Sequence, residues 1–330
     1  MQHTDHATLN ASEQLVVAAA AAAAPSVFNT QPWSFVFTDA GMEVHADPHD
    51  ASMPTASAAR DVRLSCGAAV FNARVALARR GHGSRVSVFP DEGDPLLVAR
   101  VAVTDDAPDR ALDELYRWLG SRRTNRYPFR PEGIPAAVLA LLHDAARREG
   151  ATLRLLEGEP EYQRMLTSIR HATWAEDDAV REDRGARLSP SARPPAIPVG
   201  NLGPVPRPGR PDDAPVRDMA QGLDLPGRGS AAFEPHPDLA VLETADDDPG
   251  AWIAAGQALQ RLLLEATGHG IAASFANQPL EDAELRPDVA SGAAHFGHPQ
   301  MVLRLGYATQ QPPIPPRRPL SQVIRESGAA

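Results

Sequence analysis

An internal repeat constrains the architecture of this chain more than any other feature of the sequence. The segment 74–83 (RVALARRGHG) is similar to the segment 261–270 (RLLLEATGHG). The glycines that end the two helical patterns, Gly81 and Gly268, are 268 − 81 = 187 residues apart. Solenoid repeats have periods of about 20–50 residues, so this spacing indicates duplication of a larger unit. Because the chain has 330 residues, more than most single domains, we expect two related halves.

The composition is that of a globular protein and excludes several functional classes. Apolar residues make up 43% of the chain, and no run reaches the roughly 18 residues that a membrane span needs. A net charge of −10 argues against a nucleic-acid or anionic-membrane surface. All 32 basic residues are arginine, which excludes a catalytic Schiff base and the lysine of a phosphate-binding P-loop.

The cellular location that we expect is the cytoplasm. Cys66 is the only cysteine, so the chain forms no internal disulfide, as is usual in a reducing compartment. The apolar run 15–24 follows Asp5 and Glu13 without a preceding basic residue, which is the wrong charge pattern for a signal peptide. We interpret that run as an alanine-rich helix.

Hydrophobic periodicity predicts an α+β fold in which helices surround mixed sheets. Helices are expected over 15–24, 60–80, 135–148, 158–181 and 249–267, and strands over 34–46 (a hairpin), 86–89, 96–103, 152–157, 239–244, 271–275 and 301–306.

The loop 24–33 (APSVFNTQPW) joins the alanine-rich helix to the first strand. Two prolines bracket six residues that neither a helix nor a strand can absorb, because proline lacks an N–H donor and restricts the residue before it. The polar side chains of the loop can hydrogen-bond the edge of a planar polar ring. The plainer alternative is a capping turn, which needs fewer such residues. The candidate binding residues here are Ser26, Asn29, Thr30 and Gln31.

A second candidate site is the basic segment 121–129 (SRRTNRYPF). Guanidinium groups form paired, charge-assisted hydrogen bonds to phosphate oxygens, and a threonine hydroxyl adds a donor. A solvated basic turn is the alternative for the first two arginines taken alone. The candidate phosphate-binding residues are Arg122, Arg123, Thr124, Asn125 and Arg126.

Residues 183–233 are rich in proline and glycine and show neither helical nor strand periodicity. A segment of this length is either a disordered linker or a functional cover, and we name it the lid segment. No metal site is predicted. His45 and His49 have a ligand-like spacing, but Pro48 breaks any helix that would place both imidazoles on one face.

The two motifs together resemble those of FMN-dependent nitroreductases. The loop is similar to the family's PSxxNxQPW segment, and the basic segment is similar to the RRSxRxF segment that grips the FMN phosphate. Ordinary members are homodimers with each FMN between subunits. Residues 146–151 stand where a second PSxxNxQPW loop would be expected. The chain therefore looks like the Acg-type branch, a single-chain pseudo-dimer with a first half over 1–115 and a second half, containing the lid segment, over 116–330.

The resemblance implies FMN as cofactor and assigns roles to particular residues. Arg122, Thr124 and Arg126 would meet the phosphate, with basic residues of the C-terminal tail behind them. Asn29 and Gln31 would face the ring or the ribityl chain, and the backbone of 274–277 would lie along the ring. The positions added by the resemblance are Ser274, Phe275, Ala276, Asn277, Arg317 and Arg318.

The expected function is flavin-mediated two-electron reduction of a small nitroaromatic or quinone-like acceptor, with NAD(P)H as electron donor. The alternative is a lidded protein that binds or sequesters FMN with little or no turnover. No catalytic acid or base is predicted from the sequence. The expected assembly is a monomer built as an internal pseudo-dimer, with neither a nucleic-acid nor a membrane partner.

Overall fold

The computed structural model describes residues 8–47, 56–174, 197–207, 216–220, 225, 227–290 and 297–326. Its α-helices are α1 (Ala11–Ala22), α3 (Ala56–Arg79), α4 (Arg110–Leu115), α5 (Ala136–Arg148), α6 (Glu159–Trp174), α8 (Pro249–Gly268), α9 (Gln278–Glu281), α10 (Arg286–Ala290) and α11 (Leu320–Val323). Short 3₁₀ turns occur at η1 (Val27–Asn29), η2 (Tyr116–Trp118) and η3 (Val199–Asn201). None of the described helices is long and apolar enough to cross a membrane.

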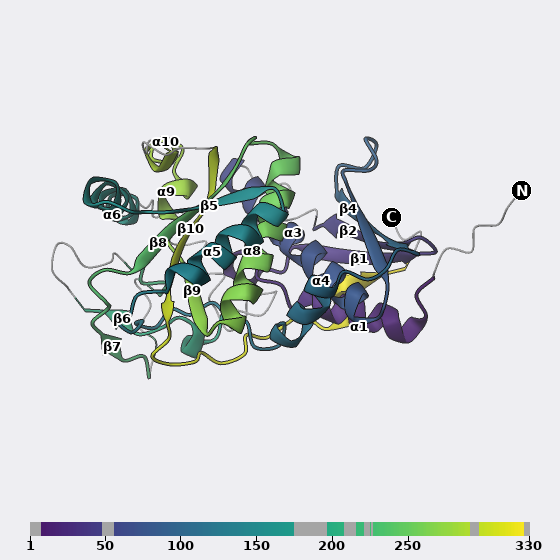
Figure 1. Cartoon of the computed structure of the whole chain (residues 1–330), viewed down its shortest axis with the longest axis horizontal. Helices are drawn as coiled ribbons and strands as arrows, with labels where there is room; N and C mark the ends of the chain where they lie inside the picture. The colour runs from purple at the N-terminus through teal and green to yellow at the C-terminus, as the bar shows by residue number, and fades with distance from the viewer. Residues whose placement is uncertain are drawn as a thin grey trace, which may run out of the picture.

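The strands form two main sheets and one small ribbon. The strands are β1 (Trp33–Thr38), β2 (Gly41–Ala46), β3 (Gly83–Val88), β4 (Leu97–Thr104), β5 (Ala151–Leu155), β6 (Val205–Pro206), β7 (Ser230–Ala231), β8 (Asp238–Thr244), β9 (Ile271–Phe275), β10 (His298–Tyr307) and β11 (Ile324–Arg325). The two main sheets lie toward opposite ends of the molecule, and the long helices α3 and α8 lie between them (Figure 1).

The two main sheets have the same strand order. One has the order β11-β1-β2-β4-β3 and the other β5-β8-β10-β9, and apart from β11 all neighbours are antiparallel. In each half a helix precedes the first strand, and a long helix connects the second strand to the third. The predicted α+β fold is confirmed. The five-stranded sheet is mixed, because β11 pairs parallel with β1.

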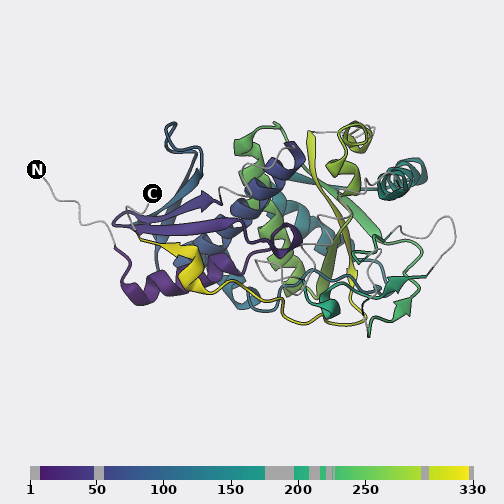
Figure 2. The same cartoon turned by 180° about the vertical axis from the view of Figure 1, so that it is seen from behind.

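The C-terminal tail joins the two halves. From β10 it runs across the molecule to β1, where Ile324 pairs with Phe35 and Arg325 with Val36 (Figure 2). This pairing connects positions almost 290 residues apart and was not predicted, because two residues of strand carry no periodic signal.

The long helices touch backbone to backbone where they cross. A Cβ atom added to Gly67 would lie 2.2 Å from the carbonyl oxygen of Ile253, and one added to Gly256 would lie 2.1 Å from that of Leu64. The contact is reciprocal, because 64 + 189 = 253 and 67 + 189 = 256. Such an arrangement is what a two-fold axis produces between identical subunits. The spacing also agrees, to within two residues, with the repeat in the sequence.

Buried polar contacts hold the same pair of helices in register. Gln260 of α8 donates to the Asn72 side chain of α3 (2.7 Å), which in turn donates to the carbonyl of Ala20 (2.8 Å). Arg74 and Arg261, which correspond to each other in the repeat, both pair with Glu149, at 2.5 and 2.7 Å. Since unpaired buried polar groups are costly, these contacts select one orientation of the two halves.

The predicted long helices are found within a few residues of their expected bounds. The short helices α4, α9, α10 and α11 were not predicted. In the lid segment the structure corrects the expectation of no regular structure, since β6 and β7 pair over two residues and η3 forms one turn. The predicted end of the helix at about residue 181 lies outside the described residues.

We expect Gly256→Ala to destabilise the protein although alanine favours helix. The new methyl group would overlap the Leu64 carbonyl, and overpacking of this kind typically costs about 1–3 kcal/mol. Urea denaturation would measure the loss. Gly133→Ala is the control, because a Cβ there meets nothing within 4 Å. Equal stability of the two variants would show that the crossing tolerates a wider separation.

Candidate functional site

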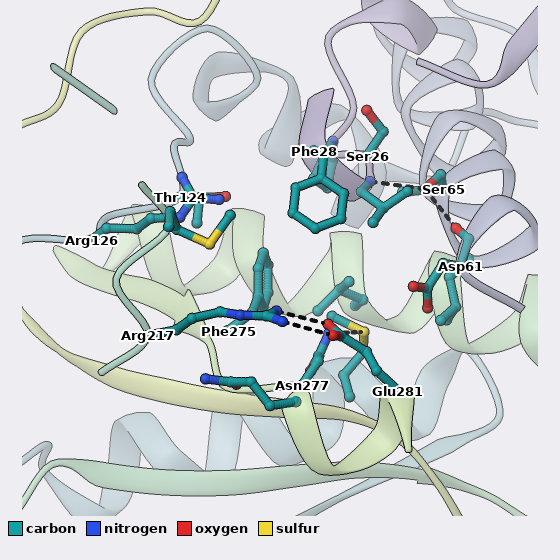
Figure 3. A pocket seen from close by; sticks show the side chains of 18 residues that line it. Ser26, Phe28, Asp61, Ser65, Thr124, Arg126, Arg217, Phe275, Asn277 and Glu281 are labelled. Carbon is teal, nitrogen blue, oxygen red and sulfur yellow. Dashed lines mark hydrogen bonds and ion pairs between the residues drawn. The ribbon is translucent and has the colours of Figure 1, made fainter. Parts of the chain in front are cut away.

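A pocket of about 830 Å³, including its open mouth, lies between the two halves (Figure 3). This central pocket is bounded by the loop before β1, by α3 and α8, by the end of β9 and by part of the lid segment. Its size is that of a small-molecule site. Its lining residues are Pro25, Ser26, Val27, Phe28, Asp61, Leu64, Ser65, Ala68, Thr124, Arg126, Arg217, Met219, Leu259, Phe275, Asn277, Gln278, Glu281 and Met301.

The loop before β1 has a strained backbone. Phe28, Asn29 and Gln31 adopt φ values of 46°, 60° and 52°, which side-chain-bearing residues rarely take. The turn is closed by the backbone N–H of Gln31, which donates to Ser26 Oγ (3.0 Å). Its bend directs the ring of Phe28 into the pocket, where Phe275 lies opposite (Figure 3). Strain held in this way is typical of functional sites.

Two of the predicted loop residues bind the C-terminal tail. The Asn29 amide donates to the carbonyl of Pro316 (3.0 Å) and accepts from Arg317 (2.7 Å). The Gln31 side chain accepts from the backbone N–H of Arg318 (2.8 Å). The prolines of the tail supply carbonyls without N–H donors, so amide side chains are suitable partners. Neither amide is among the pocket-lining residues, and their contact with a flavin stays a prediction.

The remaining loop and tail residues also have structural partners. The Thr30 hydroxyl donates to the Val27 carbonyl (2.9 Å). Arg318 donates to the backbone carbonyls of Gln31 (3.2 Å) and Gln322 (3.0 Å). Of the loop residues predicted from the sequence, Ser26 is the one that lines the pocket.

A cluster of arginines gathers beside the loop, and we name Arg122, Arg123 and Arg317 the arginine cluster. Arg122 is 6% exposed, and its Nε and Nη1 atoms have no hydrogen-bond partner among the described residues. Burial, together with the charges of Arg317 and Arg123, lowers the pKa of Arg122 to about 9. A buried charge without a partner is costly. The cluster therefore has the properties of an anion site.

Arg317 reaches this cluster from the far end of the chain. Its guanidinium donates to the carbonyls of Ala23 (3.0 Å) and Ala24 (3.3 Å), just beyond the end of α1. Burial and the nearby charge of Arg123 lower its pKa to about 10. Its Nε atom has no hydrogen-bond partner among the described residues, so it too can receive an anion.

The basic segment connects the cluster to the pocket. Thr124 forms a parallel bridge with Ala273, so the segment is extended there, and alternate residues share a face. Thr124 and Arg126 line the pocket, and Arg122 belongs to the same alternating set. Arg126 donates to the Asn201 carbonyl (3.0 Å), and burial lowers its pKa to about 10.

Alternation also explains which predicted residues do not line the pocket. Asn125 hydrogen-bonds the Gln310 carbonyl through its amide (2.8 Å) and holds the segment in place. On the other side of the bridge, Phe275 and Asn277 line the pocket whereas Ser274 and Ala276 do not. The N–H of Ala276 donates within the sheet to Val302 (2.9 Å).

Described parts of the lid segment lie against the pocket. Arg217 and Met219 line it, and Arg217 donates twice to the Glu281 carboxylate at 3.1 Å (Figure 3). Met219 also belongs to an apolar cluster that packs against Phe28; the buried members of that cluster are Ile197, Leu202, Met219 and Ala220. The predicted cover is thus anchored on both sides of the pocket, by an ion pair and by apolar contact.

Asp61 is the pocket residue that sequence reasoning missed. Its side chain is 19% exposed and lines the pocket, with Arg60 Nη2 at 3.5 Å from Oδ1. Burial raises the pKa of Asp61 to about 6, in spite of the attraction of Arg60. A signal was present: Asp61, Leu64, Ser65 and Ala68 follow helical spacing on one face, where a carboxylate is out of place.

No metal site appears in the described part of the chain, where no group of three or more His, Cys, Asp or Glu side chains could hold an ion. His49 lies outside the described residues.

Sequence relatives define the family. No protein-family model matches the chain. The Mycobacterium tuberculosis protein named "Putative NAD(P)H nitroreductase Rv3131" is 32% identical over 324 residues, which cover 91% of this chain and 88% of the relative. "Putative NAD(P)H nitroreductase acg" of the same organism is 25% identical over 314 residues, covering 91% and 92%. The chain therefore belongs to the nitroreductase superfamily, as predicted.

Solved structures show more distant similarity. A nitroreductase with bound FMN from Bacteroides fragilis matches 66% of this chain and 97% of its own, with 16% identity and a TM-score of 0.38. The FMN-dependent nitroreductase NfnB from Mycobacterium smegmatis, in complex with NADPH, matches 63% and 96%, with 17% identity and a TM-score of 0.39. Both TM-scores are low, so family membership rests on the sequence relatives.

We expect Asp61→Asn to stabilise the protein increasingly as pH rises from 4 to 8. The folded protein holds the Asp61 proton up to pH of about 6, whereas the unfolded chain releases it near 3.8. The native state therefore binds more protons between these values, and the carboxyl group lowers stability as pH rises through them. Asparagine removes this loss of about 1–3 kcal/mol.

Urea denaturation of both proteins at several pH values would measure the difference. Asp39→Asn, in the exposed turn between β1 and β2, is the matched control. A constant stability difference across this pH range would contradict the raised pKa of Asp61.

Proposed function

We propose that this chain is an FMN-binding oxidoreductase of the nitroreductase type. The observation that carries the proposal is the Arg122 guanidinium, which is buried beside Arg317 without an acidic partner among the described residues. A dianionic phosphate would supply the missing charge and hydrogen-bond acceptors. The same segment places Thr124 and Arg126 at the wall of a pocket large enough for a planar ring.

The residues present fit FMN at both ends. The arginine cluster would hold the phosphate, with Thr124 as an additional donor. Phe28 and Phe275 offer apolar surfaces to a ring, and Ser26 and Asn277 offer polar groups at its edge. Bound FMN would supply the two-electron chemistry. The chain would orient the ring, place positive charge near it and exclude water with the lid segment.

We further propose that the two halves form a single-chain pseudo-dimer with one FMN site. The common strand order and the reciprocal contact of Gly67 and Gly256 support a duplicated unit. At residues 146–151, where a second binding loop would be expected, Glu149 instead pairs with Arg74 and Arg261. These ion pairs leave the arginines no free charge for a second phosphate. The halves that we propose are residues 1–115 and 116–330.

The proposed reaction is reduction of a small nitroaromatic or quinone-like acceptor with electrons from NAD(P)H. The relatives named as NAD(P)H nitroreductases support the electron donor. Saturable reduction of the protein-bound flavin by NADPH or NADH in stopped-flow absorbance is the expected result. Reduction by dithionite but by neither nicotinamide would overturn the enzymatic proposal.

The alternative is a protein that stores FMN beneath the lid segment. It is favoured by the Arg217–Glu281 ion pair and by the apolar contact of Met219 with Phe28, which together close over the pocket. This function requires slow flavin exchange and little turnover with any acceptor.

We expect Arg122→Gln to weaken FMN by about 1.5–3 kcal/mol, which is typical for loss of hydrogen bonds to a charged group. Riboflavin lacks the phosphate, so its affinity should hardly change. Fluorescence titration of the flavin-free protein with both ligands would measure this, with the exposed Arg147→Gln as control. Equal losses for the two flavins would mean that Arg122 has only a structural role.

We expect Arg217→Ala to speed both flavin release and reduction by dithionite, by up to about fivefold. The ion pair with Glu281 is partly exposed, and pairs of this kind contribute about 0.2–1 kcal/mol. Stopped-flow absorbance gives both rates. Arg207→Ala, also in the lid segment but exposed and away from the pocket, is the control. Unchanged rates in Arg217→Ala would remove the ion pair from the proposed closure.

A further inference from the structure

We propose that Asp61 makes the end of the central pocket remote from the arginine cluster selective for the charge of an aromatic ligand, favouring cationic over anionic rings. This deepens the proposed function, because this end would receive the acceptor if FMN occupies the arginine end. The charge preference itself belongs to the protein and does not require the flavin.

The pocket has opposite charges at its two ends. Arg126 and Thr124 lie on one side of the rings of Phe28 and Phe275, and Asp61 and Glu281 lie on the other (Figure 3). Of the described residues that line the pocket, Asp61 and Glu281 are the acidic ones.

The charge of Glu281 is already neutralised. Its two carboxylate oxygens each accept a hydrogen bond from Arg217 at 3.1 Å. Two well-formed contacts of this kind leave little charge for a ligand to sense. The remaining acidic group on this wall is Asp61.

The charged groups that face Asp61 come from its own helix, from α9 and from α10, and they are Arg60, Glu281 and Arg286. Arg60 is 2% exposed and donates to the Leu280 carbonyl (3.1 Å), so its charge is buried behind the wall. Arg286 is held by Asp247 through two hydrogen bonds of 2.7 and 2.8 Å. A ligand in the pocket therefore meets the Asp61 carboxyl group before either arginine.

Protonation of Asp61 changes what this wall can bind. Above pH 6 the carboxylate attracts a cation and repels an anion. Below pH 6 the neutral acid lacks the charge and can donate a hydrogen bond. Since the carboxyl group is shielded from bulk water, its charge acts on a ligand with less screening than a surface charge would.

Three probes of one shape would test the proposal: 4-nitrobenzylammonium, 4-nitrobenzamide and 4-nitrobenzoate. Their charges are positive, neutral and negative, and none of them titrates between pH 5 and 8. Isothermal titration calorimetry on the oxidised holoprotein would give their dissociation constants without any turnover. At pH 7.5 we expect the cation to bind at least about tenfold more tightly than the anion, the effect of one pKa unit. At pH 5 the ratio should shrink severalfold, with a midpoint near pH 6.

Asp61→Asn should remove the preference at both pH values and leave the affinity of 4-nitrobenzamide unchanged, whereas Asp39→Asn should behave as wild type. A preference that persists in Asp61→Asn would assign the selectivity to another group. Equal affinities in the wild type at pH 7.5 would overturn the proposal, and this holds even if the variant fails to fold.

Flavin content, measured on the same preparations, separates this proposal from the proposed function. A flavin-free protein that still shows the charge preference would contradict FMN binding and leave the Asp61 proposal standing. A one-flavin protein without the preference would do the reverse.

Discussion

The backbone contact between α3 and α8 is the constraint on which the rest of the structure depends. Gly67 and Gly256 have no side chains, so the two helices approach until the backbone of one meets that of the other. Close packing of this kind fixes their angle and register. Because the pocket takes Asp61 and Leu64 from α3 and Leu259 from α8, its shape follows directly from the crossing.

The arginine cluster exchanges stability for binding. Arg122 sits in the interior without an acidic partner among the described residues, beside a second guanidinium that depresses its pKa further. Such an arrangement opposes folding of the ligand-free chain. It becomes favourable when an anion arrives, because binding then supplies the neutralising charge. Asp61 follows the same logic at the other end of the pocket, where a carboxyl group is kept against its solvation preference.

Sequence reasoning located the parts of the site whose chemistry is local. The loop at 24–33 and the basic segment at 121–129 each carry several functional groups within ten residues, and both reach the pocket through Ser26, Thr124 and Arg126. The partners of Asn29 and Gln31 were beyond prediction, because the tail that they bind is proline-rich and has no periodicity. The same holds for β11, whose pairing with β1 depends on the path of the whole tail.

The stoichiometry of bound flavin tests the central claim most directly, because only one composite site keeps both the strained loop and the arginine cluster. Flavin released by denaturation from protein reconstituted with excess FMN and then desalted would be quantified by absorbance against the protein concentration. The account predicts one FMN per chain. Two per chain would contradict the loss of the second site at Glu149, and none would contradict the assignment of the arginine cluster to a flavin phosphate.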